Sequence, residues 1–254
     1  MLLLGALVWA QAPGAAGAEA AAIKTLVGAY NDPAGTATAF DAALDNFRAQ
    51  FPHSKQMLAA LALGVRYHRA RSEYLPELRY GVAALAIDPQ DLYVLSSLGM
   101  AIPDNVKNTD LDRDQQLDRA AGFDRQVIAA ASTWLIGATG LDYGGRHYTE
   151  AQAQAMRNNL EGAAFLSLGR VASLREQPAD AVAAYQRALA FETVPDRQAQ
   201  LYYDIGAAEV LQNHPPEARA ALAKARQLAP NADLLMKLVQ TEEAKLPPAS
   251  GGGL

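Results

Sequence analysis

The sequence predicts an all-α protein built from stacked pairs of helices, and three observations support this fold class. Phe165, Leu168, Gly169 and Ala172 follow the i, i+3, i+4, i+7 spacing of one helix face. The same order of residue types occurs twice between positions 162 and 231. Half of the chain is hydrophobic, alanine is abundant and aromatic residues make up only 7%, which favours close helix packing over a sheet core. One such pair cannot bury its apolar face alone, so neighbouring pairs must stack.

The two copies of the pattern are offset by 37 residues (206 − 169 = 37). In each copy a glycine on one helix is followed, at the same distance along the chain, by an alanine on the next helix. Small residues at these positions let two helix axes approach closely, while larger side chains fill the space beside them. The residues expected to define the repeat by packing are Phe165, Leu168, Gly169, Ala181, Tyr185 and Ala188 in the first copy, and Tyr202, Ile205, Gly206, Ala218, Leu222, Ala225 and Pro230 in the second.

This pattern resembles the tetratricopeptide repeat (TPR), a unit of about 34 residues with a set order of aromatic, Leu-Gly, Ala and closing Pro positions. The second copy keeps Pro230 at the family's offset, whereas the first copy has Thr193 there and Pro195 two residues later. Ala172 and Glu209 also replace the usual Tyr. The resemblance covers most of residues 21–232. It implies an all-α, right-handed α-solenoid of TPR-like helical hairpins with a central insertion, of the exported bacterial type.

The first residues have the features of a secretory signal peptide, which we assign to residues 1–12. Leu2 to Ala10 is a short apolar run, and Ala10-Gln11-Ala12 is a small-x-small cleavage pattern. The usual basic start is missing, so the alternative is an apolar first helix of the fold. Residues 13–20 are rich in Ala and Gly and are predicted to be a disordered linker.

Residues 21–136 are predicted to form degenerate TPR-like repeats with an interrupted third unit. The first unit begins near Ala21, with a turn at residues 31–33. The second covers residues 57–91, where Leu63, Gly64 and Tyr67 match the packing positions of the family. In the third unit, Pro103 is expected to end a first helix that starts near Leu92, and a polar loop over 103–114 separates it from a long helix over 115–136.

The remaining chain is predicted to hold the two clear repeats. Residues 137–148 form a Gly-rich loop, and residues 149–232 contain the two TPR units, which start at a capping box formed by Thr149 and Gln152. Residues 233–246 are predicted to be a C-terminal capping helix, as expected at the open end of a solenoid. Residues 247–254 are predicted to be a disordered tail.

Composition and motifs argue against several classes of function. The net charge of −5 and the absence of a Lys/Arg cluster disfavour a nucleic-acid groove, and the absence of cysteine excludes thiolate catalysis. No nucleophile elbow, phosphate loop or dinucleotide motif occurs. The loop Asp110-x-Asp112-x-Asp114 resembles a calcium loop but has Gln115 and Ala121 where the motif needs Gly and Glu. We therefore expect no enzyme activity, no cofactor and no metal.

The resemblance implies a ligand groove formed by the first helix of each repeat. The groove looks apolar with isolated cations and lacks the Lys and Asn residues with which the family clamps a peptide's C-terminal carboxylate. The alternative is that many of these side chains pack against the adjacent repeat. The groove residues implied by position are Leu58, Leu61, Val65, His68 and Arg69, then Leu166, Arg170, Ser173 and Leu174, then Gln200, Tyr203, Val210 and Leu211.

The sequence thus predicts a non-enzymatic, exported scaffold, periplasmic or secreted, that binds a protein or peptide through its concave groove. No nucleic acid and no integral membrane segment in the mature chain are expected, and the oligomeric state is left open. A structural subunit of an envelope assembly or secretion machine is the alternative. A lipid- or glycan-binding helical module using Trp134, Tyr143 and Tyr148 has weaker support.

Overall fold

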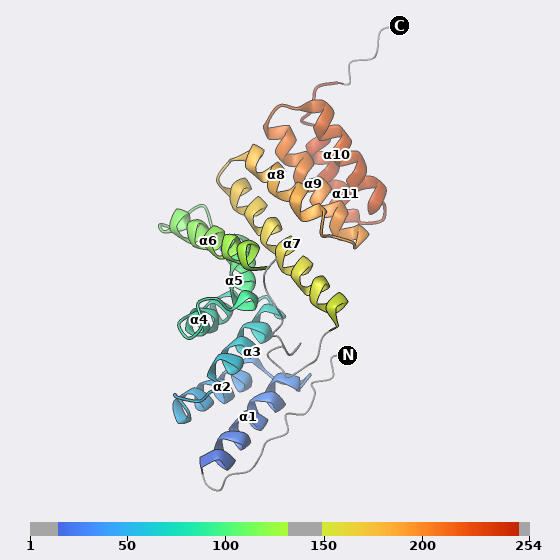
Figure 1. The fold of residues 1–254 in the computed structure, drawn as a ribbon. Coiled ribbons are helices and arrows are strands. Elements are labelled where there is room, and N and C mark those ends of the chain that lie inside the picture. Colours follow the sequence, from blue (N-terminus) through green and yellow to red (C-terminus); the bar gives the residue numbers. More distant parts are fainter. Residues whose placement is uncertain (1–14, 132–148, 249–254) are drawn as a thin grey trace.

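A computed structural model describes residues 15–131 and 149–248, and within these ranges the predicted all-α, TPR-like fold is confirmed (Figure 1). The described chain consists of eleven helices joined by turns and loops, without a strand. Their bounds are α1 Ala15–Asn31, α2 Ala37–Gln50, α3 Met57–Arg69, α4 Tyr74–Leu85, α5 Leu92–Asn105, α6 Arg113–Ala131, α7 Glu150–Leu174, α8 Pro178–Leu189, α9 Pro195–Leu211, α10 Pro215–Leu228 and α11 Asp233–Glu243.

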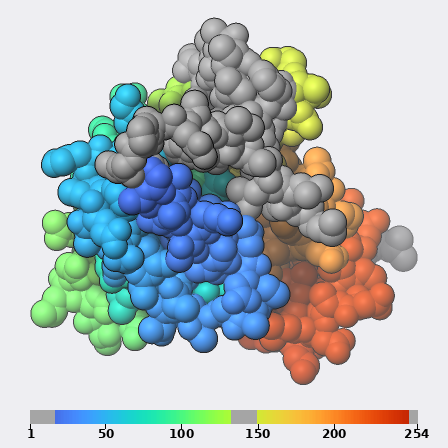
Figure 2. All heavy atoms as spheres, turned by 90° about the horizontal axis from the view of Figure 1, so that it is seen from below, coloured from blue at the N-terminus to red at the C-terminus, as the bar shows by residue number. Residues whose placement is uncertain are grey.

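The helices are arranged as five consecutive pairs followed by a last helix. Helices α1–α2, α3–α4, α5–α6, α7–α8 and α9–α10 pack as hairpins, and α11 packs on α9 and α10. Figure 1 shows the pairs following one another from α1 to α11, so each contacts mainly its neighbours. Seen from below, the α1–α2 pair covers the middle of the molecule, with α6 and the C-terminal helices emerging on opposite sides (Figure 2).

Within a pair, the repeated glycine lies directly against a large side chain of the second helix. A Cβ atom on Gly169 would come within 2.3 Å of the Tyr185 ring, and one on Gly206 within 2.7 Å of the Leu222 side chain. Gly64 meets Tyr80 in the same way, at 2.9 Å. The absence of a side chain on this glycine therefore sets how closely the two helices approach.

The turns inside three of the hairpins share one geometry. Ser72, Glu176 and Asn213 each have a φ of 56–57°, in the left-handed region. The next residue in each turn donates its N–H to a carbonyl five residues earlier, that of His68, Ala172 or Glu209. This bond satisfies a carbonyl that the helix end leaves free and turns the chain toward the second helix.

Helix α7 joins the N-terminal and C-terminal parts of the described chain. It has 25 residues and begins with the capping box between Thr149 and Gln152. Its Val171 packs with Ile102 of α5 and Leu117 of α6, while its other side pairs with α8. No described helix is long and apolar enough to cross a membrane.

Two predictions about element boundaries are wrong. Residues 15–20 are the first turns of α1 and not a disordered linker, because alanine is the strongest helix former and Glu19 accepts a hydrogen bond from Ser54. Pro103 does not end α5, which continues to Asn105, since a proline near a helix end disrupts few backbone bonds. The loop that follows covers residues 106–112.

Other predicted segments lie partly or wholly outside the described residues. These are the signal peptide at 1–12, the Gly-rich loop at 137–148, the end of the helix predicted over 115–136, and most of the tail at 247–254. The C-terminal helix α11 falls within the range predicted for a capping helix.

Candidate interaction site at the end of helix α7

Arg170 connects the first helices of three consecutive hairpins. Its guanidinium lies 2.6 Å from the carboxylate of Asp104 at the end of α5. On the other side, Arg170 acts electrostatically on Asp204 of α9. One turn further along α7, the Ser173 hydroxyl lies 3.1 Å from the hydroxyl of Tyr185. Polar groups from α5, α7, α8 and α9 therefore gather around one arginine, and we call these five residues the Arg170 cluster.

Two members of the cluster have raised pKa values because they are poorly hydrated. Burial raises the pKa of Asp204 to about 6, although a hydrogen bond from Gln200 and the charge of Arg170 lower it. Burial also raises the pKa of Tyr185 to about 12. Asp204 is thus largely ionised at neutral pH and becomes neutral in mildly acidic solution, so the charge of the cluster changes in that range.

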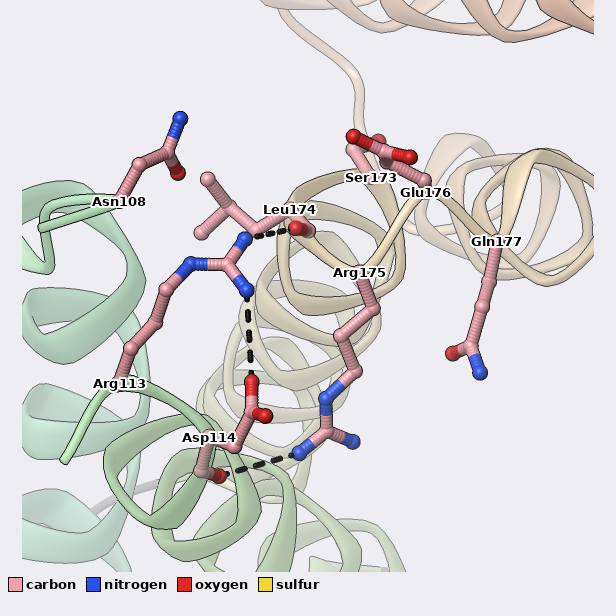
Figure 3. A pocket seen from close by; sticks show the side chains of 8 residues that line it. All are labelled: Asn108, Arg113, Asp114, Ser173, Leu174, Arg175, Glu176 and Gln177. Carbon is pink, nitrogen blue, oxygen red and sulfur yellow. Dashed lines mark hydrogen bonds and ion pairs between the residues drawn. The ribbon is translucent and has the colours of Figure 1, made fainter. Parts of the chain in front are cut away.

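An open pocket of about 820 Å³ lies next to the cluster, between the start of α6 and the turn from α7 to α8 (Figure 3). It shares Ser173 with the Arg170 cluster, and the loop after Asp104 forms its other wall through Asn108. The lining residues are Asn108, Arg113, Asp114, Ser173, Leu174, Arg175, Glu176 and Gln177.

Two arginines line this pocket, and both already form hydrogen bonds or ion pairs with other groups of the protein. Arg113 donates to the carbonyl oxygen of Leu174 and lies 3.3 Å from the Asp114 carboxylate. Arg175 lies 2.5 Å from Asp118. It also lies 3.4 Å from the carbonyl oxygen of Asp114 (Figure 3). The Nε of Arg113 is buried and has no hydrogen-bond partner in the described part of the chain. The pocket wall is therefore polar, and its positive charges are largely balanced.

Three of the groove residues predicted for the two clear repeats belong to this site. Ser173 and Leu174 line the pocket, and Arg170 is the centre of the cluster. Leu211 is 69% exposed at the end of α9. The remaining predicted residues, which are half-buried or exposed, are Leu166, Gln200, Tyr203 and Val210.

The groove predicted on the second repeat is wrong for three residues. Leu61, Val65 and His68 are each no more than 2% exposed, so they cannot contact a ligand. Helix α3 turns this face toward a hydrophobic core that α1 to α5 share, which we call the N-terminal core, and the hairpins on both sides cover it. Arg69 is half-buried, donates to the carbonyl oxygen of Ser97 and pairs with Glu77.

Leu58, the remaining groove residue predicted on α3, is half-buried against the N-terminal core.

The predicted packing residues lie as follows. Gly64, Tyr67, Gly169, Ala181, Tyr185, Ala188, Ile205, Gly206, Ala218, Leu222 and Ala225 are buried, whereas Leu63, Phe165, Leu168 and Tyr202 are half-buried. Pro230 is exposed just after α10, so it does not pack in the core as predicted. It lies in the turn between α10 and α11.

Sequence reasoning missed Asp104, Asp204 and Arg113. Asp204 had a usable signal, since it lies one helical turn after the predicted groove residue Gln200 and therefore on the same helix face. Arg113 had none, because its approach to Leu174 depends on how the loop at 106–112 folds back.

Two carboxylates of the acidic loop before α6 accept hydrogen bonds from nearby residues. Asp110 accepts the backbone N–H of Lys107 at 2.8 Å, and Asp112 accepts the Gln116 side chain at 2.8 Å. Within residues 15–131 and 149–248, no three His, Asp or Glu side chains are grouped so that they could hold a metal ion.

Comparison with known proteins gives one structural likeness. No family model matches the sequence, and no curated protein matches it. Among solved structures, a thermophilic TPR protein from Thermus thermophilus aligns over 88% of this chain and 98% of its own, with 19% sequence identity and a TM-score of 0.49. The TPR-like fold described above follows from the helix pairs and glycine contacts of this chain itself.

Proposed function

We propose that this protein is an interaction scaffold that binds a protein segment along the first helices of its last hairpins, at the Arg170 cluster and the adjoining pocket. The observation that supports this most is the placement of Arg170 between Asp104 of one hairpin and Asp204 of another. Repeat proteins present extended surfaces in this way because each repeat adds one strip to a continuous face.

The chemistry of the surface suits a segment with both apolar and polar groups. Leu174 lines the pocket and Leu211 is largely exposed, whereas Leu166 and Tyr203 are half-buried against the hydrophobic cores of the last hairpins. Partly exposed apolar side chains that surround a few fixed polar groups are typical of grooves that bind an amphipathic helix or an extended peptide. The polar groups set the position of the ligand, and the apolar side chains supply most of the affinity.

A binding measurement with matched variants tests this function. Peptides selected by display against the full chain should bind the Arg170→Ala variant at least about tenfold more weakly, as expected for a central contact residue. Arg226→Ala is the control, because Arg226 also forms a surface ion pair, with Glu243 at 2.5 Å, but on α10. The proposal would be contradicted if both variants weakened binding equally, or if neither variant weakened it.

We also propose that the protein is exported to the periplasm or beyond the cell. The support is the apolar run Leu2 to Ala10 followed by the small residues Ala10 and Ala12. N-terminal sequencing of protein from its native host should find a mature chain that starts at Pro13. A chain that keeps Met1 and stays in the cytoplasmic fraction would refute export without affecting the scaffold function.

A further inference from the structure

The third hairpin contains a carboxylate where the second, fourth and fifth hairpins place an aromatic ring or a leucine. Tyr80, Tyr185 and Leu222 each lie against the repeated glycine of their own hairpin, whereas Gly99 of α5 faces Asp124 of α6. A Cβ atom on Gly99 would come within 2.2 Å of the Asp124 carboxylate. The Asp124 side chain is 0% exposed. A buried acid thus lies directly against Gly99 in the contact between α5 and α6.

Within the described part of the chain, the Asp124 carboxylate lacks the hydrogen bonds that usually stabilise a buried charge. Neither of its oxygens has a hydrogen-bond partner among the described residues. The Ser167 hydroxyl of α7 lies nearby, but it donates its hydrogen to the carbonyl oxygen of Gly99 at 2.8 Å. That oxygen is free because Pro103, four residues later, has no N–H to donate to it. A buried, unpaired carboxylate favours its neutral, protonated form.

Burial accordingly raises the pKa of Asp124 to about 7, although Ser167 and Arg125 lower it. Arg125 belongs to α6 itself and is exposed, α7 contributes the Ser167 hydroxyl, and α5 contributes the backbone of Gly99. Proton release therefore falls in the neutral range and creates a negative charge that the three helices leave without a partner.

We propose that Asp124 is a proton-operated joint between the third and fourth hairpins, which holds α5, α6 and α7 together when neutral and loosens them when ionised. An ionised Asp124 has two ways to gain a donor. It can take the Ser167 hydrogen bond, which leaves the Gly99 carbonyl unsatisfied, or α6 can shift so that water reaches the carboxylate. Both outcomes weaken the contact between α5 and α7.

The joint also regulates the proposed binding site, and in that respect the inference rests on the proposed function. Gly99 and Asp104 share α5, and Ser167 and Arg170 share α7. A change in how α5 sits on α7 therefore alters the 2.6 Å contact between Asp104 and Arg170. The pH response of the joint itself needs no ligand, so its failure and that of the binding function can be told apart.

The first test compares unfolding by urea at pH 4 to 9 for the full chain and for Asp124→Leu and Asp124→Asn. With a folded pKa of about 7 and an ordinary value of 3.8, the contribution of Asp124 to wild-type stability falls as pH rises from 4 to 7 and then levels off. Relative to either variant, the wild-type unfolding constant should increase by a factor on the order of 10²–10³. Asp180→Asn, at an exposed position of α8, should keep the wild-type profile. Parallel profiles for wild type and Asp124→Leu would overturn the proposal.

The second test measures movement without a ligand. The chain has no cysteine, so spin labels can be attached at two introduced ones, Thr109→Cys and Gln186→Cys, both exposed. The distance distribution between them should broaden or shift from pH 5.5 to pH 8.5 in the otherwise wild-type chain and stay constant with Asp124→Leu. A constant distribution in both chains, or the same shift in both, would overturn the joint even if peptide binding is normal.

Discussion

Single residues decide how closely two helices approach in this protein. The repeated glycine leaves no side chain between the helix axes, and a ring or a leucine from the partner helix occupies the space. Tyr185 shows how tight this contact is, because it is only 3% exposed and a Cβ atom on Gly169 would come within 2.3 Å of its ring.

We expect Gly169→Ala to lower the free energy of unfolding by about 1–3 kcal/mol, because the new methyl group overlaps the Tyr185 ring. Gly122→Ala in α6 is the matched control, since a Cβ there meets nothing within 4 Å. It should raise stability by up to about 1 kcal/mol through helix propensity alone. Urea unfolding of both variants tests this, and stabilisation by both would show that the close contact is absent.

His68 is the most constrained polar residue of the N-terminal core. Its two ring nitrogens lie 2.9 Å from Asp41 and 2.7 Å from Glu73, and its ring stacks on Tyr80. His68→Ala should cost about 2–4 kcal/mol, because it leaves a cavity and removes the ring that lies within hydrogen-bond distance of both carboxylates. His53→Ala, at an exposed position, should stay within about 0.5 kcal/mol of wild type. Similar midpoints in thermal unfolding for the two variants would rule out the buried network.

At this scale the sequence predicted the glycine contacts but not the buried polar groups. The spacing of residues along the helix places Gly169 and Gly206 on a packing face, and this prediction does not depend on which side chain the partner helix contributes. Asp124 gave no such signal, because the loop at 106–112 makes the third hairpin longer and shifts the register between Gly99 and its partner. His68 was assigned to the groove from its position in the repeat, yet the first hairpins cover that side of α3.

At the scale of elements, helix α5 depends on a side chain from another hairpin. Pro103 removes the N–H that would bond to the carbonyl oxygen of Gly99, and Ser167 of α7 supplies the missing donor. The element boundary predicted at Pro103 was wrong for this reason: a serine 64 positions away (167 − 103 = 64) compensates for the proline, and local sequence cannot reveal it.

A double-mutant cycle tests this compensation. Ser167→Ala should cost about 1–3 kcal/mol, because it leaves the buried Gly99 carbonyl without a donor. In a Pro103→Ala background the same change should cost less, since the new backbone N–H of residue 103 can donate to Gly99. Equal costs in the two backgrounds, measured by urea unfolding at pH 5 where Asp124 is neutral, would contradict the account.

For the whole molecule, stacking of hairpins explains how local patterns give an extended surface. The two clear repeats were predictable because their spacing recurs, and their first helices place Arg170 and Asp204 close together. The pocket at Arg113 and Arg175 was not predictable, because it lies between two hairpins and depends on a loop. Recognition is therefore expected on the face formed by the first helices and the start of α6, and the other second helices should act as support.

Photo-crosslinking in cells that make the full chain tests this division between helices most directly. A photoreactive amino acid is placed at Ser173 or Gln200 on the first helices, or at Gln186 or Gln227 on the second helices, all of them exposed positions. The account predicts adducts to a protein partner from Ser173 and Gln200 and none from the other two. Adducts that form equally at all four positions, or only at Gln186 and Gln227, would contradict it.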